Sequence, residues 1–220
     1  MNTHAAHWFP LQALLLLAEG LGAVFRVEQE AGSEVAEETE DADQACMRQL
    51  AAGDTSALKR LFDRWKLPLL NYFYRALGNR ADAEDLALQV FERVYRAAGR
   101  YRPEARFSTW LFSVARRELL HELRRRRRKP VEAVPSEELD LGAAGVSEDE
   151  PGRVREAEEH LLSTLQELPE RERSALLLTA AGELSSTEVA RTVGVSPNHL
   201  NVILHRARQK LRALLDRAMS

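Results

Sequence analysis

The stretch FSTWLFSVARRELLHELRRRRRK, residues 107–129, contains no glycine or proline and changes from apolar at its start to cationic at its end. Such a stretch predicts a single helix, for which Ser108 is the expected N-cap. Its last six residues, Arg124 to Lys129, are all basic. A basic helix end can lie along a phosphate backbone, and exposed aromatic rings can stack on unpaired bases. Nucleic-acid binding is therefore the favoured interpretation, and a solvated helix end or an electrostatic tail is the alternative.

The composition fits a soluble protein of one or two small domains. The chain has 220 residues, of which 45% are hydrophobic and 30% charged, and its formal net charge is −3. Acidic residues are concentrated at 28–43 and 132–150, whereas basic residues are concentrated at 93–129 and 191–217. This segregation places local cationic patches on a chain that is not basic overall.

Cysteine usage and the N-terminal stretch bear on location. The single cysteine, Cys46, cannot form an internal disulfide, which fits a reducing cytoplasm, and no cysteine cluster suggests zinc. The apolar run Leu11–Ala18 is interrupted by Gln12, and no Lys or Arg precedes it. This run is too short to span a membrane, and the absence of a basic residue before it argues against a signal peptide. An amphipathic docking helix and upstream sequence included by the choice of start codon both remain open.

The pattern along the chain predicts an all-α protein with two small helical domains joined by a flexible linker, because no useful length alternates with period two. Residues 1–42 are an N-terminal appendage, apolar and then acidic and mostly disordered. Residues 43–129 and 156–220 are the two domains, and the proline-, glycine- and acid-rich residues 130–155 are the linker. Pro68 is expected to begin or kink a helix. Helices in the first domain are expected near 43–52, 54–77, 81–98 and 108–128.

The second domain carries a helix-turn-helix pattern. Ser185–Glu188 is a capping box that starts a helix, Gly194 supplies a tight turn, and Ser196-Pro197 starts the next helix. This arrangement lets a second helix enter the major groove of DNA, although an ordinary helical hairpin is the alternative. Asparagine and histidine can contact bases, and basic side chains can hold phosphates. The residues expected to bind DNA are Ser196, Asn198, His199, Asn201, Arg206, Arg208 and Lys210, with Val202 also outward.

Short sequence motifs follow one another along both domains. They are Ala83–Leu86, Val90-Phe91, Trp110–Phe112, Val114–Arg116 and Leu123–Arg125, followed by Leu168–Arg171, Leu184-Ser185, Glu188–Ala190, Gly194–Ser196 and Leu204–Arg208. Each motif alone is weak, but the ordered set resembles the bacterial RNA polymerase sigma factors of the extracytoplasmic-function (ECF) type.

The resemblance implies a division of labour between the two domains. The first would be a sigma region 2 bundle that binds the clamp helices of the polymerase and opens the minus-ten promoter element. The second would be a sigma region 4 domain that reads the minus-thirty-five element as duplex. The implied partners are core RNA polymerase, promoter DNA and an anti-sigma factor, with no membrane insertion and a cytoplasmic location. No enzymatic activity and no cofactor are expected, and the sequence shows no nucleophile, metal or phosphate-loop constellation.

The resemblance also assigns residues of the first domain. An outward leucine beside acids, on the helix beginning near Asp82, is expected to contact the polymerase, the alternative being a solvated face. The loop at 100–108 and Trp110 lie where the family captures a flipped base, although Trp110 and Phe112 fit a core equally well. The expected polymerase-binding residues are Glu84, Asp85, Leu88, Gln89 and Glu92. The expected DNA-binding residues are Arg102, Trp110, Arg116, Arg117, His121, Arg124, Arg125, Arg127 and Arg128.

The first domain departs from the family pattern at four of these positions. Leu88 and Gln89 stand where Gln and Glu are usual, which makes the expected polymerase contact more apolar. Arg117 and His121 stand where Asn and Asp are usual on the promoter-reading helix. Both changes add or permit positive charge, which favours grip on the backbone over selection of bases.

The recognition helix departs as well, since Asn201, Val202 and Ile203 replace residues that are commonly basic or small. The leading hypothesis is an alternative sigma factor that directs promoter recognition and melting. The alternative is a sigma-like adaptor or decoy that binds polymerase or DNA without opening promoters. A third hypothesis, suggested by the N-terminal apolar run, is a membrane-associated or partner-sequestered regulator.

Overall fold

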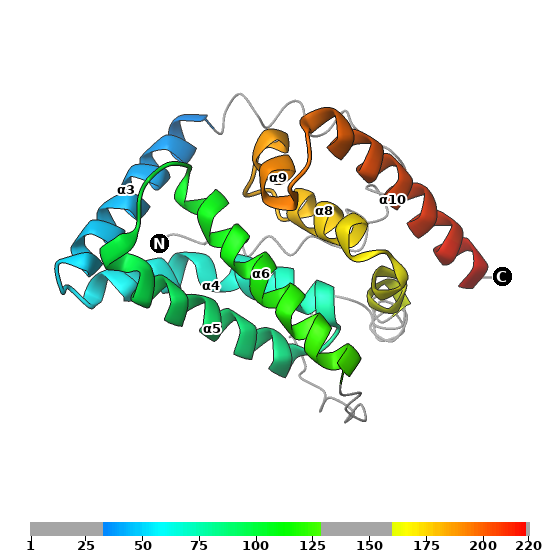
Figure 1. The fold of residues 1–220 in the computed structure, drawn as a ribbon, viewed down its shortest axis with the longest axis horizontal. Helices are drawn as coiled ribbons and strands as arrows, with labels where there is room; N and C mark the ends of the chain where they lie inside the picture. Colours follow the sequence, from blue (N-terminus) through cyan, green and yellow to red (C-terminus); the bar gives the residue numbers. More distant parts are fainter. Residues whose placement is uncertain (1–32, 129–159, 219–220) are drawn as a thin grey trace, which may run out of the picture.

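The computed structural model describes residues 33–128 and 160–218. Helices and short turns make up this part of the chain, and no strand occurs in it, which confirms the all-α prediction (Figure 1). The apolar run at 11–18 and the expected linker at 130–155 lie outside the described residues. Among the described helices, none combines the length and apolar character that crossing a bilayer requires.

Within each of the two described ranges, the elements follow one another with short breaks. Residues 160–167 are also helical. The elements are α3 (Ser33–Ala51), α4 (Ser56–Leu77), α5 (Arg80–Ala97), the 3-10 turn η2 (Ala98–Arg100), α6 (Phe107–Arg128), α8 (Glu170–Ala180), α9 (Ser186–Val193) and α10 (Pro197–Ala218).

The break between α4 and α5 has a local cause that the sequence contains. Gly78 adopts the left-handed conformation (φ 68°) and its N–H donates to the Tyr74 carbonyl, which ends α4. Asn79 then caps α5, because its side-chain oxygen accepts a 3.0 Å hydrogen bond from the Asp82 N–H. The break expected between the helices near 54–77 and 81–98 is therefore confirmed.

Three local predictions differ from the structure. α3 begins at Ser33 and not near residue 43, so the end of the expected acidic tether is helical; acidic residues in the early turns of a helix are favoured by its dipole. Pro68 lies inside α4 and therefore does not begin a helix, one of the two roles expected of it; apolar burial on both sides of Pro68 sustains the helix. Ser108 is not the N-cap of α6, since the fully buried Phe107 is already the first helical residue.

The core of the first domain lies between α4, α5 and α6. Trp65, Tyr72 and Phe73 of α4 are buried, and the rings of Tyr72 and Phe112 meet edge to face with centroids 5.7 Å apart. Phe112 is therefore a core residue, one of the two roles that the sequence left open for it. Cys46 is buried in the same cluster.

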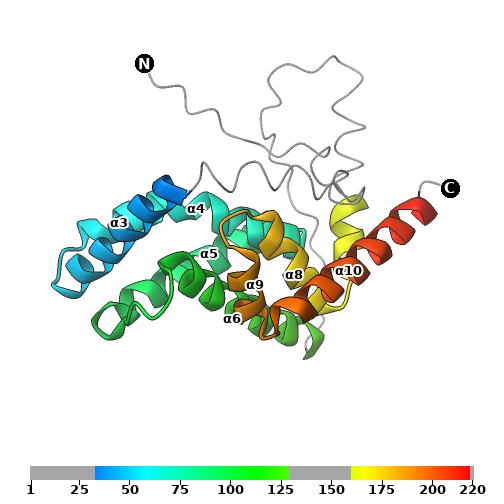
Figure 2. The same ribbon diagram turned by 90° about the horizontal axis from the view of Figure 1, so that it is seen from above.

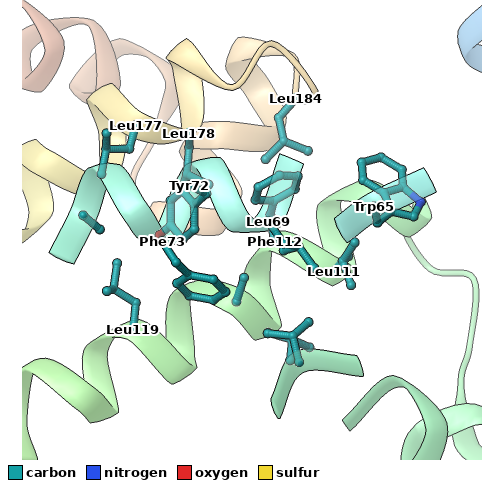
Figure 3. Packing of buried hydrophobic residues seen from close by; sticks show 14 of the residues in the cluster. Trp65, Leu69, Tyr72, Phe73, Leu111, Phe112, Leu119, Leu177, Leu178 and Leu184 are labelled. Carbon is teal, nitrogen blue, oxygen red and sulfur yellow. The ribbon is translucent and has the colours of Figure 1, made fainter. Parts of the chain in front are cut away.

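The core continues into the second domain. The helices α8 and α9 lie against α4 and α6 in both views, and residue contacts join α4 to α8 and α6 to α9 (Figure 1, Figure 2). Figure 3 shows Leu177, Leu178 and Leu184 packing toward Tyr72 and Phe112 in one apolar cluster. The two helical domains are thus packed on each other in this structure.

Candidate functional surfaces

The outward face of α5 lies where the sequence predicts it. Leu86, Val90 and Val94 are buried against the bundle, which turns the residues between them to solvent. Leu88 is 57% exposed, which is unusual for a leucine on a helix that already buries an apolar face against the bundle. Glu84, Asp85, Gln89 and Glu92 are exposed around it.

Leu88 belongs to an apolar groove between α4 and α5. Phe62 and Phe91 meet there with ring centroids 4.8 Å apart, and Tyr95 is 53% exposed. The α4 side of this groove was missed by sequence analysis, although Leu58 and Phe62 stand at i and i+4 and therefore share a helix face. The lining residues are Thr55, Leu58, Lys59, Phe62, Leu88, Phe91, Glu92 and Tyr95.

The loop before α6 presents a half-buried tryptophan. The Trp110 ring centroid lies 5.1 Å from that of Tyr101 and 5.7 Å from that of Phe107. Part of the ring stays accessible, so Trp110 is both a packing residue and a candidate stacking surface. Arg102, in the same loop, is exposed.

The basic end of α6 is partly neutralised from within the helix. Glu122 accepts hydrogen bonds from Arg125 (2.7 and 2.8 Å) and Arg126 (2.8 Å), and Arg126 also pairs with Asp82 at 2.7 Å. These bonds, led by that from Arg125, lower the pKa of Glu122 to about 2 against the opposing effect of burial. Arg124, Arg127 and Arg128 are exposed at the same end.

The predicted helix-turn-helix is confirmed by its caps. Ser185 caps α9 in a complete capping box with Glu188. Gly194 is left-handed (φ 78°) and ends α9. The Ser196 hydroxyl then accepts a 3.3 Å hydrogen bond from the His199 N–H, which starts α10 with Pro197 as its first residue. Ser196 is thus engaged in capping.

The outward side of α10 is mostly polar near its start. The side chains of Asn198, His199, Asn201 and Arg206 are exposed, and Val202 is 45% exposed. These positions face solvent because the helix buries the intervening residues. The buried residues are Leu200, Ile203, Leu204, Ala207 and Leu211.

Three other residues of α10 are less accessible. Ile203, one of the three departures from the family pattern in this helix, is buried, because the i, i+3, i+4 stripe places it inside. Arg208 is half-buried, and this burial lowers its pKa. Lys210 donates 2.8 Å hydrogen bonds to both carboxylate oxygens of Glu172.

Comparison with known proteins identifies both domains. Residues 61–129 match the Sigma-70 region 2 family, and residues 158–211 match the Sigma-70, region 4 family. The chain is 31% identical over 169 residues to the RNA polymerase sigma factor CarQ of Myxococcus xanthus, covering 77% of this chain and 95% of CarQ. The chain is an RNA polymerase sigma factor of the ECF type. It binds core RNA polymerase and promoter DNA and directs promoter recognition for transcription initiation.

Other sigma factors give the same result. The chain is 32% identical over 185 residues to CnrH of Cupriavidus metallidurans, covering 80% of this chain and 96% of CnrH. The solved structure of CnrH in complex with the cytosolic domain of CnrY is similar, with 26% identity, a TM-score of 0.59, and coverage of 80% of this chain and 97% of that chain. The sigma factor RpoE bound to the anti-sigma factor NepR from Bartonella quintana shares the fold, with a TM-score of 0.55 at 19% identity over 72% of this chain and 98% of that chain.

In this sigma factor, the α6 residues expected to bind the promoter strand differ in their accessibility. Arg117 and His121 are exposed. Arg116 instead reaches from region 2 to region 4, where Nη2 donates a 3.0 Å hydrogen bond to Glu170 Oε1 and Nη1 donates to the Thr192 carbonyl at 3.5 Å. No local spacing could have identified Glu170 as its partner. Within the described residues, no group of His, Cys, Asp and Glu side chains could hold a metal ion.

Proposed function

We propose that this sigma factor binds core RNA polymerase through the outward face of α5. Leu88 supports the proposal, because a leucine that is more than half exposed beside an apolar groove loses water-accessible area when a partner helix covers it. Glu84, Asp85, Gln89 and Glu92 form the polar rim around this anchor.

We assign the promoter strand to the loop at 100–108 and the exposed side of α6. Arg102 and the accessible part of Trp110 would hold an unstacked base, and the exposed Arg117 and His121 would contact the strand further along α6. Exposed arginines at the end of α6 then hold phosphates, whereas Arg125 contributes less because Glu122 neutralises it. The terminal phosphate-binding residues are Arg124, Arg127 and Arg128.

We assign the duplex to the exposed start of α10. Asn198, His199 and Asn201 are candidate base contacts, and Arg206 is a phosphate contact. Lys210 joins them only if it leaves Glu172. The proposed domain limits, 43–129 and 156–220, contain both family matches.

We further propose that the protein acts without chemistry of its own, in the cytoplasm. An anti-sigma factor is a further partner, because the similar solved structures hold CnrH with CnrY and RpoE with NepR.

Transcription with purified core polymerase and genomic DNA tests the proposal. Permanganate reactivity of unpaired thymines would report strand opening, and co-sedimentation would report core binding. A sigma factor binds core and produces defined start sites with open strands. Core binding without strand opening would favour a sigma-like adaptor or decoy, and absence of both would overturn the proposal.

A further inference from the structure

The start of α10 exposes a valine that the fold leaves outside its core. Val202 is 45% exposed, and it is not among the residues that pack against the apolar cluster of the two domains. The inner face of α10 is complete without it, since Leu200, Ile203 and Leu204 are buried. Valine is also less favourable than alanine in a helix, so this side chain adds nothing to the stability of α10 by itself. Val202 is therefore apolar surface that is available to a ligand.

Val202 stands at the centre of a polar stripe. Asn198, Asn201, His205 and Arg206 are exposed, and together with Val202 they follow the i, i+3, i+4, i+7, i+8 spacing of one helix face. The rise along the helix axis from Asn198 to Arg206 is about 12 Å, close to the width of about 12 Å of the major groove. If α10 enters a major groove with this face, Val202 points toward the base edges at the middle of the contact.

Other polar groups of α10 are already engaged. The Ser196 hydroxyl caps the helix, Arg208 is half-buried, and Lys210 is bonded to a carboxylate of α8. No aspartate or glutamate occurs between Pro197 and Leu215, so no side chain on this part of the helix repels a phosphate backbone. The face around Val202 is therefore the part of α10 that is best placed to approach DNA.

The base edges of DNA differ in what they offer to a valine side chain, which neither donates nor accepts a hydrogen bond. The C5-methyl group of thymine is the apolar group that a base presents in the major groove. Contact between this methyl group and valine removes apolar area of both from water. Cytosine presents an amino group instead, and a valine that covers it leaves the donor without an acceptor. Val202 should therefore favour thymine and disfavour cytosine.

We propose that Val202 is a specificity-determining residue, which packs against the C5-methyl group of a thymine in the promoter duplex. The inference rests on the proposed binding of duplex by the start of α10. Asn201, the preceding residue, and Asn198, one turn earlier, can each make paired hydrogen bonds to an adenine. The same helix face thus selects A·T base pairs through an apolar contact and through amide contacts, while Arg206 holds a phosphate.

Three variants separate the reading of a methyl group from effects on the helix. Val202→Ser removes the apolar surface, and serine has a helix propensity similar to that of valine. Val202→Ile keeps the apolar surface. Ala213→Ser introduces the same hydroxyl at an exposed position about 16 Å further along α10, beyond the width of the groove. Circular dichroism should give the same helix content and melting transition for all three, because both positions are exposed.

The preferred duplex is found by selection. Holoenzyme reconstituted from the full-length chain and core polymerase is incubated with a random-sequence duplex library, and the bound fraction is sequenced. We expect the parent and Ala213→Ser to enrich the same sequence, in which one thymine is no longer preferred over cytosine by Val202→Ser. If Val202→Ser enriched thymine as strongly as the parent at every position, the proposal would be wrong.

A uracil scan of the enriched duplex then isolates the methyl group, because uracil keeps O4 and the base pairing of thymine and lacks only the C5-methyl. Each thymine is replaced singly, and affinity is measured by competition in fluorescence anisotropy. We expect one replacement to weaken binding of the parent and of Val202→Ile by about fourfold, the effect of one buried methyl group. The same replacement should leave the affinity of Val202→Ser unchanged. Replacements at the other thymines, including those in the melted element, should affect the parent and Val202→Ser equally.

The possible failures are distinguishable. A holoenzyme that enriches a sequence but gives the same uracil profile with and without Val202 would overturn this inference alone. A uniform loss of affinity for all duplexes in Val202→Ser would do the same, because it would show that the valine supports the helix and does not read a base. A holoenzyme that enriches no duplex would overturn the proposed function, and this inference with it.

Discussion

Thr109 and Glu188, which lie in different domains, share a buried hydrogen bond of 2.7 Å between the threonine hydroxyl and Oε1 of the carboxylate. The other carboxylate oxygen, Oε2, accepts from the N–H and the hydroxyl of Ser185 at 2.8 and 2.7 Å. One side chain thus completes the N-cap of α9 and ties that helix to α6. Burial acts to raise the pKa of Glu188, but the hydrogen bonds from Ser185 and Thr109 outweigh it and the pKa is lowered.

Thr109→Val should destabilise the protein while keeping the shape of the side chain. The substitution leaves Glu188 buried without its interdomain donor, and loss of a hydrogen bond to a charged group costs about 1–2 kcal/mol. Urea denaturation followed by circular dichroism measures the change in the free energy of unfolding. Thr187→Val, at an exposed position of α9, is the control and should change stability little. Equal effects of the two substitutions would contradict a stabilising role for the Thr109–Glu188 bond.

Glu122→Gln should remove a pH-dependent part of the stability. The folded-state pKa of about 2 lies below the ordinary 4.5, so the carboxylate stabilises the folded protein above about pH 4.5 and this contribution is lost as pH falls toward 2. We expect a loss of about 1–2 kcal/mol at pH 7, since the solvent around the exposed Arg125 screens part of the interaction. Thermal unfolding between pH 3 and pH 7 measures it. Parallel stability curves of the variant and the parent across this range would contradict the assignment.

The sequence predicted those structural features that depend on residues close together in the chain. The helix-turn-helix follows from Ser185, Gly194 and Ser196, because caps and left-handed turns are made by residues a few positions apart. The pairing of Glu122 with the arginine run was missed, although its i+3 and i+4 spacing was readable. The Arg116–Glu170 contact depends on how two domains pack, and no periodicity encodes that.

The exposed arginines at the end of α6 should set the salt dependence of DNA binding. Replacing Arg124, Arg127 and Arg128 with Ala together should weaken binding to a single-stranded oligonucleotide and reduce the slope of log K against log salt by about 2. Arg125 is left in place because Glu122 holds it. Fluorescence anisotropy from 50 to 300 mM salt, roughly the range over which counterion release is resolved, measures the slope.

A matched loss of positive charge elsewhere is the control for this slope. Arg48, Lys66 and Arg96 are exposed on α3, α4 and α5. Their joint replacement with Ala removes the same charge from surfaces to which we assign no DNA contact. If both triple variants flattened the slope equally, the α6 end would be acting only through net charge.

Leu88→Asp should weaken binding to core polymerase without unfolding region 2. The leucine is 57% exposed, so a charge there costs little in the free protein, but it would be buried in the complex. We expect an affinity loss of about tenfold or more, as for an anchor at the centre of an interface. Leu67→Asp is the matched control, because Leu67 is 56% exposed on α4 and does not line the groove. Biolayer interferometry with immobilised core polymerase measures both, and equal affinities of the two folded variants would remove the α5 face from the polymerase interface.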